Sequence, residues 1–421
     1  MEKFLKFCMI TTFYPPYNFG GDGIYVYRLS NELARRGHRV DVIHCEDAYA
    51  LLQSNGVGSD YPNHENVKVH KLKSRASVMS PLLTQQTGIP FFKGKKIKKL
   101  LDENQYDVIH FHNMSLIGIT ALRYVRDAVR LYTTHEHWLV CPMHVLWKFN
   151  REVCTKKSCT LCMLAARRPP QLWRHTGLME KTLRHVDCFI APSRFTLAKH
   201  LETHPDISIT HIPHFLPKPE EANEISVPTP PPAEGRLYFL YVGRLEKIKG
   251  VQNLIPVFQN RPDYDLLVAG DGEYRQELVE LAGNARNVKF LGKLNYEKLK
   301  ELYRGAVAVV VPSICYETFG MIIIEAFSMK TPVIVNNLGA LPEVVEDSGG
   351  GFIYNDLDDL ALAMDKLTKE TGLRSQLGMK GYEAYLKYWT EDVHILQYMN
   401  LIHETQEKHL NKSNSVVGEY I

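Results

Sequence analysis

The stretch that decides the fold reads VPSICYETFGMIIIEAFSMKTPVIVNNLGALPEVVEDSGGGFIY and spans residues 311–354. It begins at the end of an apolar run, passes through a polar loop and enters an apolar helical segment at about residue 319. A second apolar run follows at 332–336. A strand, a helix and another strand in this order predict a parallel βαβ unit whose sheet is buried on both faces.

The same alternation extends over most of the chain. Further apolar runs with the length of strands lie at 7–11, 40–44, 107–112, 131–134, 188–191, 238–242, 265–269, 288–291 and 307–311. Amphipathic helical stretches separate many of them, such as the one at 26–36. The fold class predicted from this rhythm is α/β, with two doubly wound, Rossmann-like domains facing a central cleft.

A proline-rich segment divides the two series of strands. Residues 216–235 read LPKPEEANEISVPTPPPAEG, and proline at that density ends helices and strands, so this segment is predicted to be a linker. The predicted domains are therefore residues 1–215 and 236–395. A cysteine-rich insertion interrupts the first domain at about 141–175, and residues 396–421 form a helix whose end, after Lys408, is expected to fray.

Composition excludes several classes of protein. The 421 residues carry a net charge of only +3 and no nucleic-acid recognition motif, so no nucleic-acid partner is expected. No apolar run approaches the roughly 20 residues that span a bilayer. The N-terminal MEKFLKFCMITTFYPP lacks the long apolar region of a signal peptide. We therefore expect a cytoplasmic protein whose eight cysteines are thiols or metal ligands.

A glycine-rich turn follows the first predicted strand. Gly20, Gly21 and Gly23 lie between that strand and the next helix, where backbone N–H groups and the helix dipole favour an anion. The spacing GGDG differs from the dinucleotide fingerprint GxGxxG. The turn is thus a candidate phosphate contact, and the alternative is an ordinary strand-to-helix connection.

Two basic residues follow the first strand of the second series, in YVGRLEKIKG at residues 241–250. Arg244 and Lys249 can both reach the carboxyl end of that sheet. A guanidinium and an ammonium would stabilise the charge that develops on a diphosphate leaving group. The alternative is that both are merely solvated.

Two carboxylates in the opening stretch complete the candidate site. Glu317 lies in the loop and Glu325 in the helix, about 12 Å apart if all the intervening residues are helical. The acid and the nucleophile of a glycoside hydrolase are about 5 to 9 Å apart, so this spacing favours contacts with two parts of one extended ligand.

Together these motifs resemble glycosyltransferase family four, a group of retaining enzymes with the GT-B fold. The resemblance is carried by GRLxxxKG, by ExFGxxxxEA and the following PV, by the N-terminal glycine loop and by RGHxV at residues 36–40, and it covers nearly the whole chain. It implies transfer of a hexose or N-acetylhexosamine from a nucleoside-diphosphate sugar to a carbohydrate or lipid-linked acceptor, or to a small molecule. It also implies that catalysis requires no cofactor.

The resemblance also implies roles for individual residues. Gly21 would approach the donor diphosphate, and Arg244 and Lys249 would grip it. Glu317 would bind the transferred sugar, and Glu325 would hold the ribose hydroxyls. The backbone that would lie beside the sugar and phosphate belongs to Thr318, Phe319 and Gly320. The chain departs from the family pattern at Met329–Lys330 and Leu338–Ala340, which puts the identity of the sugar in doubt.

A histidine follows a strand of the first series in LYTTHEHWLVCP. His135 matches the family's histidine that contacts the donor sugar. His137, two residues later, is the alternative for that role, although a structural role suits it better.

Four cysteines follow directly. Cys141, Cys154, Cys159 and Cys162 have the spacing C-x12-C-x4-C-x2-C, which suits a structural zinc ion with all four positions filled, and an iron–sulfur cluster would use the same ligands. The alternative is four reduced, buried thiols.

Basic and apolar residues alternate in FFKGKKIKKLL at 91–101. Interleaved lysines, from Lys93 to Lys99, and bulky apolar residues suit an anionic membrane surface, which would attach the protein peripherally to the inner face of a membrane. The alternative is an ordinary solvated face of a basic helix. Trp138, Trp147, Trp173, Arg167 and Arg168 are expected to extend this surface.

Two other functions remain open from the residues alone. A doubly wound fold is also compatible with an NAD-dependent oxidoreductase, although GxGxxG is missing. A non-enzymatic module organised by the four cysteines is the second alternative.

Overall fold

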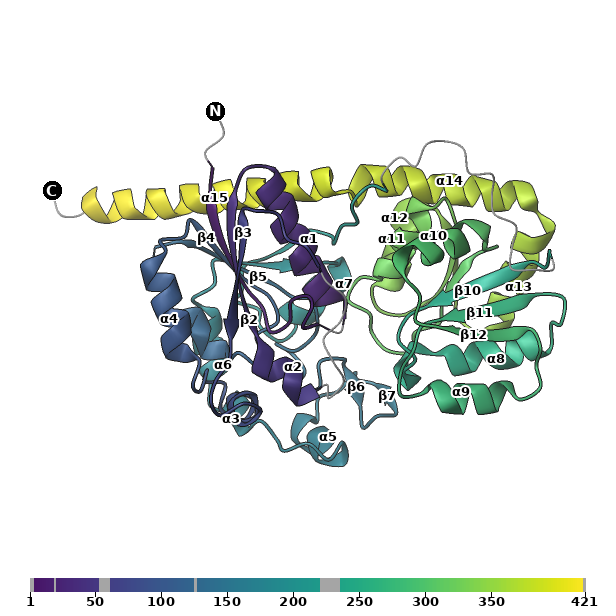
Figure 1. The fold of residues 1–421 in the computed structure, drawn as a ribbon, viewed down its shortest axis with the longest axis horizontal. Coiled ribbons are helices and arrows are strands. Elements are labelled where there is room, and N and C mark those ends of the chain that lie inside the picture. Colours follow the sequence, from purple (N-terminus) through teal and green to yellow (C-terminus); the bar gives the residue numbers. More distant parts are fainter. Residues whose placement is uncertain (1–3, 19, 53–60, 125–126, 220–234, 419–421) are drawn as a thin grey trace. The chain divides into compact units, whose positions relative to one another are not determined.

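The computed structural model describes residues 4–18, 20–52, 61–124, 127–219 and 235–418. The chain divides into two compact units: Met1–Ile212 together with His394–Ile421, and Pro213–Val393. We call these the N-terminal unit and the C-terminal unit. Each contains a parallel sheet with helices on both faces (Figure 1).

The N-terminal unit has a seven-stranded sheet with the order β3-β2-β1-β4-β5-β8-β9. Its strands are β1 (Lys6–Ile10), β2 (Arg39–Cys45), β3 (Val67–Leu72), β4 (Val108–Phe111), β5 (Val129–Thr133), β8 (Cys188–Ala191) and β9 (Ile209–His211). The five strands predicted here are confirmed to within two residues. The two edge strands, β3 and β9, escaped prediction because both are partly exposed and carry polar residues among the apolar ones.

Helices and one small hairpin surround this sheet. They are α1 (Gly21–Arg35), α2 (Glu46–Leu52), α3 (Met79–Thr87), α4 (Gly94–Glu103), η1 (Ile119–Tyr124), the hairpin β6 (Trp147–Lys148) and β7 (Glu152–Val153), α5 (Cys159–Ala165), η2 (Leu172–His175), α6 (Leu178–Leu183), α7 (Arg194–Leu201) and α15 (Glu391–Gly418). The hairpin and α5 form the cysteine-rich insertion.

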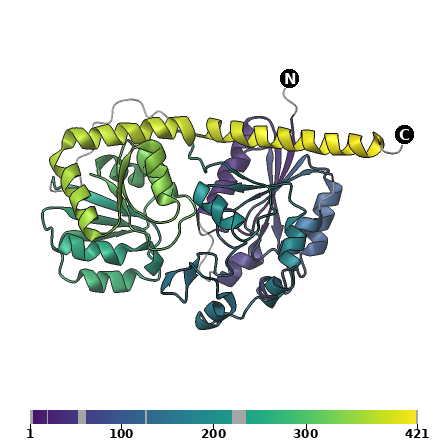
Figure 2. The ribbon, with the colours of Figure 1, turned by 180° about the vertical axis from the view of Figure 1, so that it is seen from behind.

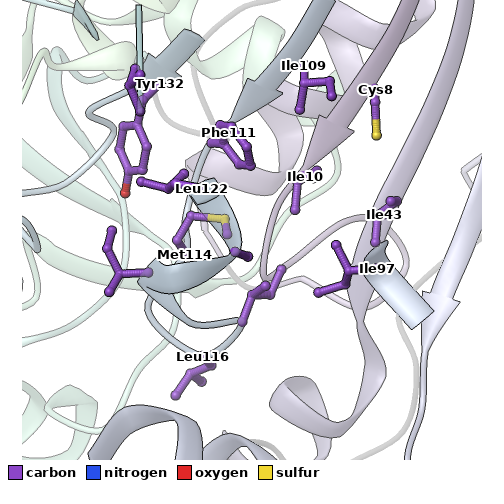
Figure 3. Close-up of a cluster of buried hydrophobic side chains, with 14 of the residues drawn as sticks. Cys8, Ile10, Ile43, Ile97, Ile109, Phe111, Met114, Leu116, Leu122 and Tyr132 are labelled. Carbon is purple, nitrogen blue, oxygen red and sulfur yellow. The ribbon is translucent and has the colours of Figure 1, made fainter. Parts of the chain in front are cut away.

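The core on one face of this sheet shows why these runs form strands (Figure 3). Cys8 and Ile10 of β1 and Ile109 and Phe111 of β4 are buried in one cluster, because alternate residues of a strand face the same side. Ile97 of α4 is buried in the same cluster. The neighbours of these strand residues are buried on the opposite face, as expected for a parallel sheet covered on both sides.

The C-terminal unit has a six-stranded sheet with the order β12-β11-β10-β13-β14-β15. Its strands are β10 (Tyr238–Val242), β11 (Asp265–Ala269), β12 (Val288–Gly292), β13 (Val309–Val311), β14 (Val333–Asn336) and β15 (Gly351–Tyr354). Its helices are η3 (Lys247–Lys249), α8 (Val251–Gln259), α9 (Arg275–Ala282), α10 (Tyr296–Gly305), α11 (Met321–Ser328), α12 (Leu341–Ser348), α13 (Leu357–Lys369) and α14 (Thr371–Tyr388). In sequence terms this is strand order 3-2-1-4-5-6, the Rossmann arrangement.

Two segments differ from their predicted form. Most of the predicted linker, residues 220–234, lies outside the described residues, and its first residues belong to the C-terminal unit, where the N–H of Leu216 donates to the carbonyl of Trp389 at 2.9 Å. The tail that was predicted to fray after Lys408 is helical as far as Gly418, where α15 ends, and residues 419–421 lie outside the described residues. From His394 onward α15 belongs to the N-terminal unit, against which Figures 1 and 2 show it in yellow.

Candidate active site

Each sheet reverses its strand order beside its first strand. β1 lies between β2 and β4, and β10 lies between β11 and β13. In doubly wound folds, ligands bind outside the carboxyl ends of the strands that flank such a reversal. The segments after β10 and β13 carry Arg244, Lys249 and Glu317, and the loop after β1 leads to Gly21, the first residue of α1. The predicted residues therefore lie at the edge of each sheet that is suited to a ligand.

In the C-terminal unit, a glycine joins the loops that follow β10 and β13. Gly250 has φ 77°, and a Cβ added to it would lie 1.8 Å from the carbonyl oxygen of Pro312. Next to this contact, the N–H of Ile314 donates to the carbonyl of Ile248 at 2.9 Å. The backbones of the two loops touch, and this contact holds Lys249 beside the loop that carries Glu317.

Lys249 and Glu317 form the centre of the candidate site. Lys249 Nζ donates to Glu317 Oε1 at 2.7 Å, and each side chain is 21% exposed. Ser313 Oγ, just beyond β13, donates to the same oxygen at 2.6 Å. The serine was missed in the sequence, although a polar residue directly after a buried strand is a usable signal. The three residues place an ammonium, a carboxylate and a hydroxyl at one edge of the sheet.

Both charges of this pair are stabilised by their proximity. Burial alone would raise the pKa of Glu317, but Lys249 and the hydrogen bonds hold that pKa below its ordinary value. Burial alone would lower the pKa of Lys249, but Glu317 raises it. The ion pair therefore stabilises the fold above pH 4.5 and below pH 10.5. Its contribution is lost as the pH falls through the lowered pKa of Glu317 or rises through the raised pKa of Lys249.

Arg244 lies near this pair with a different direct partner. Its guanidinium contacts Glu246 Oε1 at 2.7 Å, and its side chain is 58% exposed. Its charge also helps to lower the pKa of Glu317, so it acts on the same site electrostatically. The guanidinium is thus an exposed cation beside a half-buried ion pair.

The segment after Glu317 turns sharply into α11. Gly320, with φ 101°, caps the helix, which begins at Met321, two residues later than predicted. Phe319 is buried and packs edge-on against His214 at 5.6 Å, so only its backbone is suited to a ligand. Across from this turn the N–H of Ala340 donates to the carbonyl of Glu317 at 3.3 Å. Leu338–Ala340, where the chain departs from the family pattern, therefore lies against Glu317.

Glu325 has a separate environment on α11. Tyr303, on α10, donates a hydrogen bond from its hydroxyl to Glu325 Oε2 at 2.9 Å. Burial, followed by the carboxylate itself, raises the pKa of Tyr303 well above its ordinary value, so the hydroxyl remains a donor. Glu317 and Glu325 thus have different partners within the protein. The tyrosine was not found from the sequence.

In the N-terminal unit, the glycine turn forms the start of α1. Gly20 caps the helix with φ 149°, and a Cβ added to Gly21 would meet no atom within 4 Å, so the space beside Gly21 is open. Asp22 contributes a carboxylate to this helix start, where it accepts from the N–H of Gly23 at 2.8 Å and from Asn113 at 3.1 Å. The backbone favours an anion here, whereas the charge of Asp22 opposes one.

His135 lies just beyond β5 in a group of aromatic side chains. A hydrogen bond of 2.9 Å joins His135 Nε2 to His112 Nδ1, and the ring of Tyr25 packs edge-on at 4.8 Å. Burial, followed by neighbouring histidines, lowers the pKa of His135 to about 3. The imidazole is therefore neutral near pH 7 and suited to hydrogen bonding.

The group extends to α15. A hydrogen bond of 2.8 Å joins Tyr25 to His394, and one of 2.9 Å joins Tyr398 to His110. The sequence HFHN at 110–113 was a missed signal, because it places polar residues in and directly after a buried strand. No local sequence pattern indicated the contribution of α15, because Tyr398 lies 288 positions from His110 in the sequence.

Buried histidines make the N-terminal unit sensitive to acid. Burial is the main cause that lowers five pKa values, to about 4 for His44 and His200 and to about 3 for His110, His135 and His137. As the pH falls below 6.5 the unfolded chain binds protons that the folded chain excludes, so the free energy of unfolding falls.

We expect this unit to lose up to about 2 kcal/mol for each of these histidines between pH 7 and pH 5, because each pH unit below the ordinary pKa is worth about 1.4 kcal/mol per group. The C-terminal unit contains one histidine, His214, and is expected to change little. Hydrogen exchange followed by mass spectrometry at both pH values, corrected for intrinsic rates, measures each unit. Equal loss of protection in both units would contradict the prediction.

The structure does not bring His137 together with His135. His137 is buried, stacks on His200 with ring centroids 6.0 Å apart and packs edge-on against Phe195. His137 therefore has a packing role, in agreement with the structural role that suited it better in the sequence.

The four cysteines of the insertion line one small pocket between the hairpin and the start of α5. All are free thiols, and the N–H of Phe149 donates to Cys162 Sγ at 3.3 Å. Across the described ranges, however, no three His, Cys, Asp or Glu side chains are arranged so that they could hold a metal ion. The cysteines converge as predicted but, as placed, do not form a coordination sphere, and we derive no step from a metal here.

Within the part of the chain that the structure describes, none of the helices has both the length and the apolar character needed to cross a membrane.

Comparison with known proteins agrees with this arrangement. The family model "Glycosyltransferase Family 4" matches residues 19–218, and the model "Glycosyl transferases group 1" matches residues 224–384. An uncharacterised glycosyltransferase of Methanocaldococcus jannaschii is 27% identical over 407 residues, which are 92% of this chain and 96% of that protein.

Solved structures show the same fold. The sucrose-phosphate synthase of Thermosynechococcus elongatus superposes with a TM-score of 0.71 at 21% identity, over 96% of this chain and 100% of the other. The Anabaena protein HepE, solved in complex with UDP and glucose, superposes with a TM-score of 0.65 at 17% identity, over 95% and 100% of the two chains. The two family models match the two Rossmann-like units in turn. The chain therefore belongs to the family-four type of GT-B glycosyltransferases.

Proposed function

We propose that this glycosyltransferase moves a hexose or an N-acetylhexosamine from a nucleoside-diphosphate sugar to a glycan, a lipid-linked acceptor or a small molecule, with retention of anomeric configuration. The observation that carries the proposal is the contact of Lys249 and Ser313 with Glu317, outside the carboxyl ends of β10 and β13. The Anabaena structure holds UDP and glucose on a similar fold, which supports a donor of this class.

The residues of the C-terminal unit would divide the donor between them. Lys249 and Arg244 would bind the diphosphate, because the bond between the anomeric carbon and the phosphate oxygen breaks with the electron pair on that oxygen. In the described part of the chain, the side-chain hydrogen bonds of Glu317 use Oε1, and Oε2 would accept hydrogen bonds from sugar hydroxyls. Glu325, steadied by Tyr303, would accept bonds from the ribose.

Retention would follow if the acceptor attacks from the face that the diphosphate leaves. The acceptor oxygen forms the new bond to the anomeric carbon, and its proton passes to the departing phosphate oxygen. The neutral His135 would then serve as a hydrogen-bond partner of the sugar. No divalent metal is assigned a part in these steps, because the cations of Lys249 and Arg244 would supply the positive charge.

The two alternatives from the sequence lose their support. The family matches over both units are to glycosyltransferases, which argues against an NAD-dependent oxidoreductase. They also argue against a non-enzymatic module organised by cysteines.

A donor panel tests the proposal. Purified protein is incubated with UDP-, GDP- and ADP-linked hexoses and N-acetylhexosamines, with and without glycan and lipid-linked acceptors and with EDTA. We expect nucleotide release with one donor class, unaffected by EDTA, and a product with the anomeric configuration of the donor by NMR. Folded protein that releases nucleotide from no donor, or that inverts the configuration, would overturn the proposal.

A further inference from the structure

A cavity of about 150 Å³ lies within the N-terminal unit, and none of the residues assigned above to donor binding lines it. It is formed by residues 139–142 after β5, by the start of α5, by η2 and α6, and by residues 203–204 after α7. This volume is roughly ten times the space that one buried water needs. The cavity therefore admits a chemical group of several heavy atoms.

The polar side chains that line this cavity are mainly basic. They include Lys157, Arg174, His175 and His204. Among the described residues of the lining, the single carboxylate is that of Glu180, which is exposed. Burial lowers the pKa of His204, so its imidazole is neutral near pH 7. Lys157 and Arg174 thus give the cavity more positive charge than Glu180 offsets.

Arg174 is held in place on every side. Its guanidinium carbon lies 5.0 Å from the ring centroid of Trp138 and 5.1 Å from that of Trp173. Its Nε donates to Gln171 Oε1 at 2.6 Å, and its two terminal nitrogens donate to the carbonyls of Trp138 at 2.8 Å and Leu139 at 3.4 Å. A guanidinium has five N–H donors. Beside these bonds within the described part of the chain, one N–H on each terminal nitrogen remains for a partner.

The rings around Arg174 also correct the surface that was expected from the sequence. Trp138, Trp147 and Trp173 are all buried and contribute no exposed area. Lys93, expected on the same surface, is buried as well. Trp138 and Trp173 instead fix the plane of a guanidinium at the wall of the cavity.

In the ranges that the structure describes, Arg174 forms no ion pair with a carboxylate. Glu136, whose charge acts on it from nearby, contacts His144 Nδ1 at 2.6 Å instead. Burial lowers the pKa of Arg174 to about 10, because a charge held away from water is disfavoured. Charges that proteins bury are normally paired. The fold thus holds a largely buried cation at the cavity wall, where an anion could pair with it.

Two further basic side chains lie at the exposed edge of the cavity. Lys157 Nζ donates to Thr203 Oγ1 at 2.5 Å, and a hydrogen bond of 3.3 Å joins Thr160 Oγ1 to His175 Nε2. These bonds connect the walls of the cavity to one another. A ligand that enters therefore orders few side chains, which lowers the cost of binding.

Apolar side chains complete the lining. Leu139, Met163 and Met179 are buried and lie in the wall of the cavity. A small pocket that combines apolar side chains with a few fixed polar groups is the usual form of a site for a small molecule. The apolar part suits the C–H face of a sugar ring, and the cations suit a carboxylate or a phosphate.

We propose that this cavity binds the anionic group, a carboxylate or a phosphate monoester, of an acidic hexose in the acceptor. Arg174 would donate its two remaining N–H groups to the anion, an arrangement that such groups accept with two oxygens. Lys157 and His175 would contact the anion from the edge. The assignment to the acceptor rests on the proposed function and on residues 139–142, which follow His135 beyond the carboxyl end of β5.

Titration calorimetry of the full chain tests the anion site. The ligands are glucuronic acid, which carries a carboxylate, glucose 6-phosphate, which carries a phosphate, and glucose, which carries neither. We expect one of the two acidic sugars to bind at least about 10-fold more tightly than glucose, the effect of one hydrogen-bonded charge. The acidic sugar that binds more tightly identifies the anionic group.

Neighbouring lysines provide a matched pair of variants. Lys157→Glu is expected to weaken binding of the acidic sugar about 10-fold or more, because it places a second carboxylate in the lining. Lys156→Glu makes the same charge change at an exposed residue outside the lining, and its effect should stay within about twofold. An anion bound at Arg244 and Lys249 would not distinguish the two variants.

Arg174→Gln removes the main contact and is expected to abolish the preference for acidic sugars. Circular dichroism checks its fold, because the substitution also removes the cation between Trp138 and Trp173. Lys157→Glu decides the question if Arg174→Gln does not fold. Equal affinity for glucose and both acidic sugars, or equal weakening by Lys156→Glu and Lys157→Glu, would overturn the anion site.

A transfer assay tests the assignment to the acceptor. With the donor found in the panel, an oligosaccharide that ends in the acidic hexose is expected to have a lower KM than its neutral counterpart. Lys157→Glu should raise that KM and leave nucleotide release to water unchanged. Equal KM values for the two acceptors would overturn the assignment. Because calorimetry needs neither donor nor turnover, failure of the anion site is distinguishable from failure of the proposed function.

Discussion

Glu317→Gln is expected to lower the kcat/KM for sugar transfer by about 10² to 10³, the loss typical of removing one preorganised electrostatic contact. Glutamine keeps the shape of the side chain but loses the charge that Lys249 meets at 2.7 Å. It also weakens the acceptor for Ser313 at 2.6 Å. Lys249 then remains half-buried beside a neutral amide, and its position toward a diphosphate is no longer fixed. The measurement is nucleotide release with the donor found in the panel.

A matched control separates this effect from a general loss of charge. Glu297→Gln removes a carboxylate that also pairs with a lysine, Lys300 at 2.6 Å, but whose side chain is 75% exposed. Transfer by this variant should stay within about twofold of the parent, because exposed ion pairs contribute about 0 to 1 kcal/mol. Circular dichroism confirms that both variants are folded. Unchanged release by Glu317→Gln would remove the carboxylate from the mechanism.

Gly250→Ala is expected to destabilise the C-terminal unit by about 3 kcal/mol or more and to abolish most donor binding. The backbone conformation, with φ 77°, costs a residue with a Cβ on the order of 1 kcal/mol. The larger effect is steric, because the new Cβ would lie 1.8 Å from the carbonyl oxygen of Pro312. The loops after β10 and β13 must move apart, which separates Lys249 from Glu317. Urea denaturation and donor titration measure the two effects.

Gly292→Ala isolates the conformational part of this cost. Gly292 has φ 69°, and a Cβ added to it would meet no atom within 4 Å. This variant should lose only about 1 kcal/mol, and the difference between the two variants is the cost of the contact between the loops. If both variants lose the same stability, the contact of Gly250 with Pro312 does not hold the site together.

The fold could be predicted from sequence because its main signals are local. Each strand flanking a strand-order reversal is a continuous apolar run, as in β10 and β13, since a central parallel strand is buried on both faces. Edge strands such as β3 are partly exposed, so their pattern is mixed and they were missed. The predicted start of α11 was two residues too early. The helix begins only after Gly320, whose left-handed backbone ends the loop, and the apolar pattern does not show this conformation.

The candidate site was predictable in part. Arg244, Lys249 and Glu317 lie in the segments that follow apolar runs, and a parallel sheet places the carboxyl ends of its strands along one edge. The contacts of Tyr303, of His112 and of the predicted C-terminal helix were missed, because they depend on which elements lie side by side. The four cysteines show the limit of spacing as a signal, since they share a pocket without the arrangement that a metal requires.

The sequence by itself determined the two series of strands and helices, the loops that carry the charged residues and the glycine at position 250. These follow from apolar periodicity and from backbone preferences, which act over a few neighbouring residues. Only the tertiary structure decided that Lys249 pairs with Glu317 across 68 positions, that Tyr303 holds Glu325 and that Lys93 is buried. The physical reason is that such contacts depend on strand order and on the packing of distant elements, which local patterns do not encode.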